Sequence, residues 1–249
     1  MKPIHPSRQL FKESQRLPEN REKLSSLGKL SAGVAHEIRN PLTAIKLRLE
    51  TLQLALAPDS TEFREVEVIK RDVDRIQRIM SEFQEFAQPH EPRREPFLAA
   101  DLFREVATEM APIVEWAQAT VVEGPMTNMP IPADRLQIKR VLMNLITNAA
   151  ESLSTGGTIT LRAIMDMACL DGIEETGAFL LEVEDNGTGI PLDVQSKIFN
   201  PFFSTKTEST GLGLSVAARI VERHGGLLEF RTEEGRGTIF TIILPRFSR

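Results

Sequence analysis

One histidine, His36, stands in the stretch LSAGVAHEIRNPL at positions 30–42, with Glu37 next to it and Asn40 one helical turn further on. The pKa of a free imidazole is about 6.5, so the neutral ring is abundant near neutral pH and can act as a nucleophile. A carboxylate beside the ring can hold its inner N–H and accept the proton that leaves. These residue types favour His36 as the acceptor of a phosphoryl group.

His36 is expected to face solvent from a long helix. Apolar residues recur in steps of three and four over 24–56, which is a heptad seam. His36 lies two residues from both Val34 and Ile38, so it is about 160° from each around the helix. Pro41 removes a backbone donor and should bend the helix just after the histidine.

Two different roles for His36 are also compatible with this pattern. A solvated surface histidine of a coiled coil occupies the same kind of position. A zinc-binding helix would need a second histidine where Asn40 stands, so the sequence disfavours it.

A second apolar seam over 63–87 follows a break at 58–60, which predicts two long antiparallel helices joined by a short turn. One such hairpin cannot cover both of its apolar stripes, whereas two can, so we expect a homodimeric four-helix bundle. The hairpin is assigned to 21–88, after a flexible or helical arm over 1–20. Three prolines in 89–96 predict a stiff linker that can hinge.

The remaining residues, 97–249, change pattern. A loop with Pro125, Pro130 and Pro132 precedes a capping box of Asp134 and Gln137. The expected helices are 99–118, 134–153 and one that opens at Gly211 and Gly213 and stops at His224-Gly225-Gly226, and the expected strands are 120–123, 157–165, 178–185, 227–232 and 237–244.

Asn144, Asn148 and Glu151 form a polar stripe on the helix at 134–153, beside its apolar stripe (Ile138, Val141, Leu142, Leu145, Ala149, Leu153). Asparagine inside a helix costs about 0.7 kcal/mol relative to alanine, so the pair needs a reason. Hydrogen bonds to a neighbouring loop would explain it. So would an amide oxygen offered to a hard cation such as magnesium.

Asp185 shares its parity with the apolar residues of the strand at 178–185, so its carboxylate should face the core. A buried carboxylate is costly unless it accepts hydrogen bonds. A satisfied turn aspartate is common in Asp-Asn-Gly sequences. Alternatively, the polar edge of a ligand such as adenine could bind Asp185, since Gly187 and Gly189 permit the close approach of a flat ring.

Gly211 and Gly213 could let backbone N–H groups at a helix start point at phosphate oxygens. This Gly-X-Gly is weak by itself and matches neither a Walker loop nor a dinucleotide fingerprint. Phe199, Phe202 and Phe203 are expected to pin the base of the loop before it.

Together, in this order and spacing, these segments resemble the sensor histidine kinases of two-component systems over about 24–245. HEIRNP with NAAES is most similar to the nitrogen-regulation branch of that family. The matching segments are HEIRNPL (the phosphoacceptor box), NLITNA at 144–149 (the N box), DNGTGI at 185–190 (the first glycine box), FNPFFSTK at 199–206 (the F box), TGLGLSVA at 210–217 (the second glycine box) and GRGTIF at 235–240 (the last glycine-rich turn).

The resemblance implies an all-α helical hairpin that forms a dimeric four-helix bundle, followed by an α/β sandwich that binds ATP as gyrase and Hsp90 do. It implies autophosphorylation of His36 and transfer to an aspartate of a response regulator receiver domain. Asn40 would orient water for the reverse, phosphatase reaction. The implied contacts to ATP and Mg²⁺ are Asn144, Asn148 (also the metal ligand), Asp185, Gly187, Gly189, Phe203, Thr205, Lys206, Gly211, Leu212, Gly213 and Leu214.

Three features depart from the family pattern. Ser209 stands where glycine is usual, which predicts a stiffer or reshaped lid over the nucleotide and a changed kinase rate. Arg140 replaces a common glutamine. The 20-odd residues before the hairpin are too few to fold a sensor domain.

Bulk composition narrows the alternatives. The net charge of -5 argues against nucleic acid as the main partner, and Cys169 alone allows no disulfide within one chain. No apolar run approaches the roughly 18 residues of a membrane span, and no signal peptide opens the sequence, so we expect a cytoplasmic protein or the cytoplasmic part of a longer membrane-bound kinase. A related serine kinase or gyrase-like ATPase, and a non-catalytic scaffold, are the competing hypotheses.

Overall fold

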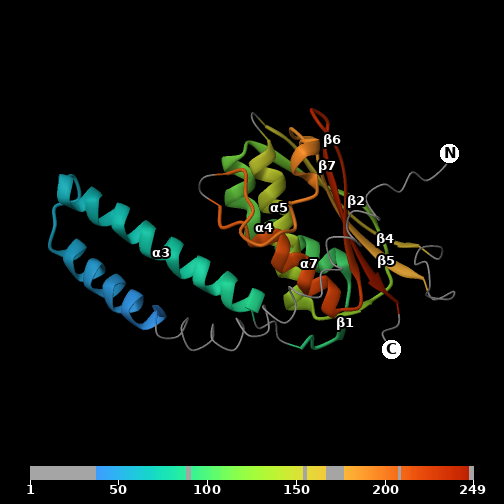
Figure 1. Cartoon of the computed structure of the whole chain (residues 1–249), viewed down its shortest axis with the longest axis horizontal. Helices are drawn as coiled ribbons and strands as arrows, with labels where there is room; N and C mark the ends of the chain where they lie inside the picture. The colour runs from blue at the N-terminus through green and yellow to red at the C-terminus, as the bar shows by residue number, and fades with distance from the viewer. Residues whose placement is uncertain (1–37, 88–90, 154–155, 167–176, 207–208, 247–249) are drawn as a thin grey trace. The chain divides into compact units, whose positions relative to one another are not determined.

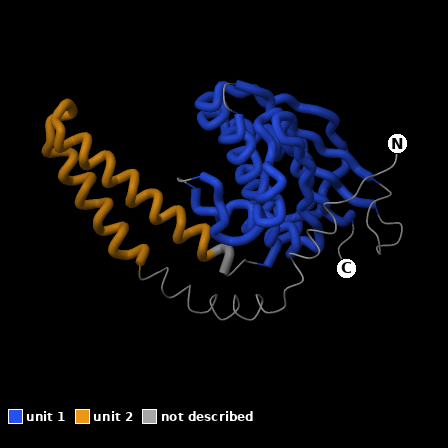
Figure 2. The backbone as a smooth tube through the Cα atoms, turned by 45° about the horizontal axis from the view of Figure 1, so that its top comes forward, with its two compact units in different colours: residues 1–16, 91–249 blue, residues 17–90 orange. Residues whose placement is uncertain are grey.

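The computed structural model describes residues 38–87, 91–153, 156–166, 177–206 and 209–246. The chain divides into two compact units at residues 90 and 91, shown in different colours in Figure 2. None of the helices in the described ranges combines the length and the apolar character needed to cross a bilayer.

The unit drawn in orange in Figure 2 is, over its described residues, a helical hairpin. A helix over 38–54 turns at 58–60 into α3 (Thr61–Ala87), as the two heptad seams predicted (Figure 1). Lys46 Nζ lies 2.7 Å from Asp74 Oδ1 across the two helices. Closer to the turn, Lys70 Nζ donates to Gln53 Oε1 at 2.7 Å. Going back along the first helix from Gln53 to Lys46 means going forward along α3 from Lys70 to Asp74, so the two contacts define an antiparallel register.

Only part of the apolar seam is covered within this hairpin. Leu42, Val66 and Val73 are buried. Five other seam residues keep between 37% and 49% of their surface exposed: Ile38, Ile45, Leu52, Ile69 and Ile76. An apolar stripe of this kind on a helix is normally packed against another surface.

The other unit, drawn in blue in Figure 2, is an α/β unit built on a five-stranded sheet in the order β2-β4-β5-β7-β6. β2 and β4 are parallel and every other pair is antiparallel. A separate two-stranded sheet pairs β1 (Glu95–Phe97) with β3 (Ile131–Ala133). The strands of the large sheet are β2 (Ala119–Met126), β4 (Gly157–Asp166), β5 (Ala178–Asp185), β6 (Leu227–Glu233) and β7 (Gly237–Pro245).

Three helices cover one face of this sheet (Figure 1): α4 (Ala99–Trp116), α5 (Arg135–Ser152) and α7 (Gly213–Arg223). A fourth, α6 (Leu192–Gln195), is a single turn. All six residues of the predicted apolar stripe along α5 are buried, and α5 packs against β4, β5 and β7 of the sheet. The expected α/β sandwich is confirmed.

The region around the prolines differs from the expected loop, because Pro125 lies in β2 and Pro132 in β3. β2 is an edge strand whose pairing register shifts between Glu123 and Met126. A proline is tolerated there because the missing N–H falls at a bulge on an open edge. The predicted strand at 120–123 is therefore the first part of β2, and the sequence pattern missed its continuation to Met126 and the three-residue β3.

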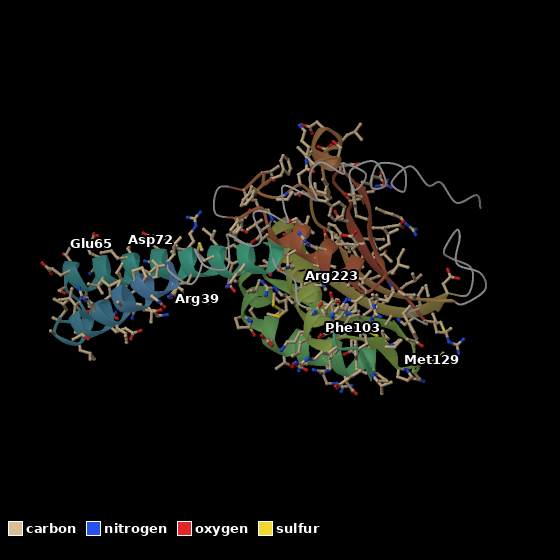
Figure 3. All side chains as sticks on the ribbon, turned by 60° about the horizontal axis from the view of Figure 1, so that its bottom comes forward. Arg39, Glu65, Asp72, Phe103, Met129 and Arg223 are labelled. Atoms are coloured by element: carbon tan, nitrogen blue, oxygen red, sulfur yellow. The ribbon has the colours of Figure 1, made fainter. Side chains whose placement is uncertain are left out.

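The second half of the predicted linker is also ordered differently. Residues 95–97 form β1, and the Arg93 N–H donates to Asp134 Oδ2 at 2.8 Å. Glu91 forms an ion pair with Arg223, which is labelled in Figure 3, at the end of α7. Residues 91–97 are thus held by the α/β unit.

Asp134 caps α5 as predicted, since its Oδ1 accepts the N–H groups of Leu136 and Gln137, each at 3.1 Å. The reciprocal half of the predicted capping box is replaced. The Asp134 N–H donates to Nε2 of the buried His224 at 3.0 Å, and His224 Nδ1 lies 2.8 Å from the Ile220 carbonyl. His224 is the C-cap of α7, so the predicted helix stop is confirmed, and the same ring also links α7 to α5.

Burial lowers the pKa of His224 from its ordinary value of 6.5, and the neutral ring is the form that accepts the Asp134 N–H. The unfolded chain therefore takes up this proton at a higher pH than the folded chain. We predict that this contribution to the free energy of unfolding is complete above about pH 6.5 and declines as the pH falls from there towards the folded pKa. His224→Gln should remove that pH dependence and cost about 1–3 kcal/mol at higher pH.

Far-UV circular dichroism follows unfolding, since Trp116, the single tryptophan of the sequence, keeps 79% of its surface exposed and is a weak probe. Denaturant titrations between pH 5 and 8 would test the prediction, with Thr108→Ala on α4 as the control variant. A pH dependence that survives unchanged in His224→Gln would contradict it.

Candidate functional site

The phosphoacceptor half of the predicted site is described only in part. His36 and Glu37 lie outside the described residues. Asn40 is exposed on the helix over 38–54, and that helix continues through Pro41. The Asn40 amide can therefore reach solvent and a docked molecule.

The N-box side chains lie on α5 as expected. Asn144 Nδ2 donates to the Gly213 carbonyl at 3.1 Å and so joins α5 to the first residue of α7. Asn148, one turn later, is half-buried, and among the described residues none forms a hydrogen bond with its side-chain amide. One asparagine thus contacts a neighbouring segment, and the amide of the other is left available to a ligand.

Asp185 lies at the carboxyl end of β5 with only 5% of its surface exposed. Its Oδ1 accepts the Gly187 N–H at 2.9 Å and the Ser152 hydroxyl at 3.0 Å. Burial raises the pKa of Asp185 above its ordinary value of 3.8, while the donors at Gly187, Ser152 and Thr238 oppose that rise. The residue is a satisfied turn aspartate and, at the same time, a buried acceptor at the edge of the site.

The segment between the F box and α7 forms a loop closed at its base. The Phe202 N–H donates to the Gly211 carbonyl at 3.0 Å. Gly211 has a φ of +66°, and a Cβ there would lie 2.5 Å from the Phe202 carbonyl carbon, so only glycine fits. The hydroxyls of Ser204 and Ser209 hydrogen-bond to each other across the loop. Ser209, the departure from the family pattern, therefore adds a cross-link that glycine could not form.

The aromatic residues of this segment do not all pin the loop, and the expectation that they would is wrong for Phe202. Phe199 packs edge-on against Phe230 with ring centroids 5.9 Å apart. Phe202 instead has a φ of +66° and keeps 63% of its surface exposed, and Phe203 is half-buried. The tight backbone contact with Gly211 turns the Phe202 side chain outwards.

The remaining predicted contacts fall into two groups. Lys206 forms an ion pair with Glu151 of α5, the helix that carries the N box. Thr205 beside it is exposed. Leu212 is fully buried and is the N-cap of α7, so its side chain belongs to the core rather than to a ligand. Leu214 is half-buried on the first turn of α7.

The donor set of the site fits Mg²⁺ that arrives with its own phosphate ligands. No cluster of three or more histidine, cysteine or acidic side chains suited to a metal occurs in the described ranges. Mg²⁺ commonly keeps several waters and binds through substrate phosphates and one or two protein oxygens. The side-chain amide of Asn148, to which no described residue hydrogen-bonds, offers an oxygen of that type.

Sequence reasoning missed two contacts of this site. It placed Ser152 in no role, and it named Glu151 only as part of a polar stripe. Spacing could have indicated both, because Glu151 follows Asn148 by three residues and Ser152 by four, so they share its side of the helix. The partner of Glu151 lies 55 residues away and that of Ser152 lies 33 residues away, so no local pattern indicates the partners.

Two family models match the chain. Residues 133–248 match the histidine kinase-, DNA gyrase B-, and HSP90-like ATPase. Residues 26–92, which include His36, match the His Kinase A (phospho-acceptor) domain.

Individual relatives and solved structures agree with these matches. AtoS, a signal transduction histidine-protein kinase of Escherichia coli K12, is 35% identical over 94% of this chain and 37% of its own length. The sensor histidine kinase ZraS of the same strain is 36% identical over 96% of this chain and 49% of its own length. The chain thus spans between a third and a half of these curated relatives.

Crystal structures of the histidine kinase ThkA share the fold. Its catalytic domain alone is 30% identical, with a TM-score of 0.53 over 62% of this chain and 96% of that one. ThkA in complex with the response regulator protein TrrA is 28% identical, with a TM-score of 0.63 over 98% of this chain and 68% of that one.

We predict that Glu151→Gln strengthens binding of ATP but not of adenosine. The Glu151 carboxylate holds the Lys206 ammonium, which an incoming phosphate must draw away. An exposed ion pair is worth up to about 1 kcal/mol, so the affinity for ATP should rise by at most about fivefold. Calorimetric titration with both ligands measures the difference.

Glu109→Gln is the matched control, because it breaks an ion pair between Lys139 and α4 without touching the site. An equal change in the affinities for ATP and adenosine would show that Glu151 does not restrain the lid lysine.

Proposed function

This chain belongs to the sensor histidine kinases of two-component systems, and on that premise we propose that it transfers the γ-phosphoryl group of ATP to His36 and then to an aspartate of a response regulator. The observation that carries the proposal is the buried Asp185 carboxylate, held as an acceptor at the end of α5, the helix that also carries Asn148 and pairs with Lys206. The match to a phospho-acceptor domain over 26–92 supports a kinase rather than a gyrase-like or serine-directed ATPase.

In this proposal the adenine amino group donates to Asp185, and the phosphates extend along α5 towards Asn148 and Lys206. Asn148 would contribute an oxygen to Mg²⁺, which supplies charge neutralisation at the phosphates when bound. The Gly211 and Gly213 segment at the start of α7 would line the phosphate end. The contact of Asn144 with the Gly213 carbonyl keeps that segment against α5.

The transfer step uses the neutral His36 ring. Its outer nitrogen attacks the γ-phosphorus, the bond to the β–γ bridging oxygen breaks, and ADP leaves. The inner N–H proton passes to Glu37, which also fixes the ring tautomer. Most of the rate enhancement would come from positioning and charge neutralisation, as in other phosphoryl transfers.

A homodimer would cover the exposed seam of the hairpin. The five seam residues left 37–49% exposed lie on both helices, so a second hairpin can pack against both at once. The resulting four-helix bundle would present His36 on its outer surface.

A receiver domain is the proposed partner, since the related ThkA is known in complex with a response regulator protein. Asn40, exposed one turn from His36, would orient water towards the phosphorylated aspartate of that regulator. We therefore propose a phosphatase activity in addition to the kinase activity.

Incubation with γ-labelled ATP should place an acid-labile, alkali-stable label on the chain, and His36→Gln should abolish it. His90→Gln, at a histidine outside the phosphoacceptor box, is the control and should keep the label. Label on serine would support a serine kinase, and nucleotide binding without label would support a scaffold, so either result would overturn the proposal.

Asn40→Ala should leave the labelling of His36 within about twofold and remove the dephosphorylation of the regulator, because the water-orienting amide is lost. Loss of phosphate from a labelled receiver domain measures the second activity. Thr51→Ala, near the turn of the hairpin, is the control. Unchanged phosphatase activity in Asn40→Ala would reject the role of Asn40.

A further inference from the structure

We propose that Ser152 is the positioning residue for adenine recognition, because its hydroxyl holds the Asp185 carboxylate as a hydrogen-bond acceptor and so selects adenine over 6-oxopurines. The inference rests on the proposed nucleotide function and adds to it the residue that determines base selectivity.

Ser152 is the last residue of α5, and three contacts hold it in place beside the first glycine box. Of these, two reach the box: its hydroxyl lies 3.0 Å from Asp185 Oδ1, and its own carbonyl accepts the Thr188 N–H at 3.2 Å. The third, 2.8 Å from the hydroxyl to the Ala149 carbonyl, lies within α5. The helix end and the glycine loop are therefore joined through this residue.

Gly187 makes room for the Ser152 hydroxyl. A Cβ at Gly187 would lie 2.1 Å from Ser152 Oγ and 2.9 Å from Asp185 Oδ1. Any side chain at position 187 would displace the hydroxyl from the carboxylate. The glycine of this box thus serves the contact between Ser152 and Asp185 as well as the turn.

The hydroxyl carries one hydrogen, which can go to Asp185 or to the Ala149 carbonyl. A hydrogen bond to an ionised carboxylate is about twice as strong as one to a neutral carbonyl, so the hydrogen favours Asp185. The Gly187 N–H donates to the same oxygen at 2.9 Å. The Thr238 N–H is a third donor to this carboxylate. An ionised carboxylate has about four acceptor positions, so at least one is left to accept from a ligand.

Base selectivity follows from this acceptor state. Adenine presents an amino group at C6, which donates to a carboxylate. Hypoxanthine and guanine present a carbonyl oxygen there, which a carboxylate repels and which a protonated carboxyl group could bind. Burial pushes Asp185 towards the protonated form, and the Ser152 hydroxyl opposes it.

The test compares ADP with inosine diphosphate, which differs at the C6 position and carries the same phosphates. The intact chain should bind ADP more tightly than inosine diphosphate. Ser152→Ala should weaken ADP binding by about tenfold, leave the binding of inosine diphosphate unchanged or tighter, and move the acid limb of ADP binding to higher pH. Calorimetry from pH 5.5 to 8 measures all three effects.

Two further variants complete the design. Ser152→Cys supplies a weaker donor of similar shape and should give an intermediate ratio of the two affinities. Thr108→Ala removes a hydroxyl that bonds a helix carbonyl on α4, away from the site, and should change neither affinity.

An equal loss of affinity for both nucleotides in Ser152→Ala would show that the residue is only structural. The same conclusion would follow if Ser152→Cys kept the wild-type ratio of the two affinities and the acid limb of ADP binding did not move in Ser152→Ala. If the intact chain bound neither nucleotide, the proposed function itself would fail, which is a separate result from an unchanged ratio.

Discussion

The arrangement of the α/β unit around its candidate site depends on how the Asp185 carboxylate is accommodated at the buried end of β5. Removing a carboxylate from water is costly unless donors surround it. Here the donors come from Gly187, Ser152 and Thr238, which belong to the glycine loop, the end of α5 and β7. Because one carboxylate gathers three segments, the requirement to satisfy it also assembles the base end of the nucleotide site.

α5 organises the rest of that site through a narrow strip of its surface. At about 100° per residue, positions 144, 148, 151 and 152 fall within an arc of about 100°. Asn144 contacts the start of α7, Glu151 holds the lid lysine and Ser152 meets Asp185. The adjoining strip of the helix is buried, so packing sets the rotation of α5 about its axis and thereby the positions of the site residues.

Much of this arrangement could be predicted from local pattern. The heptad seams, the apolar stripe of α5 and the parity of β5 are periodic signals over many residues, and the elements they predicted are present. The pairings of Glu151 and Ser152 could not be predicted, since each joins residues far apart in sequence. The strand expected at 120–123 is present in β2, but its continuation through Pro125 was missed because it lies past a bulge on an edge strand, and β3 was missed because it has only three residues. The exposure of Phe202 follows from a backbone contact with Gly211, which its aromatic character does not reveal.

The point where the chain enters the α/β unit is tied to the ends of two helices that frame the site. Arg93 donates its N–H to the carboxylate of Asp134, which caps α5, and the Asp134 N–H donates in turn to His224 at the end of α7. Arg94 and Glu91 both contact Arg223 on the last turn of α7. Residues 91–94 therefore contact the start of α5 and the end of α7 at once. Since α5 carries Asn144 and Ser152 and α7 begins at Gly213, the two helices that hold the first residues of the α/β unit also supply residues of the candidate site.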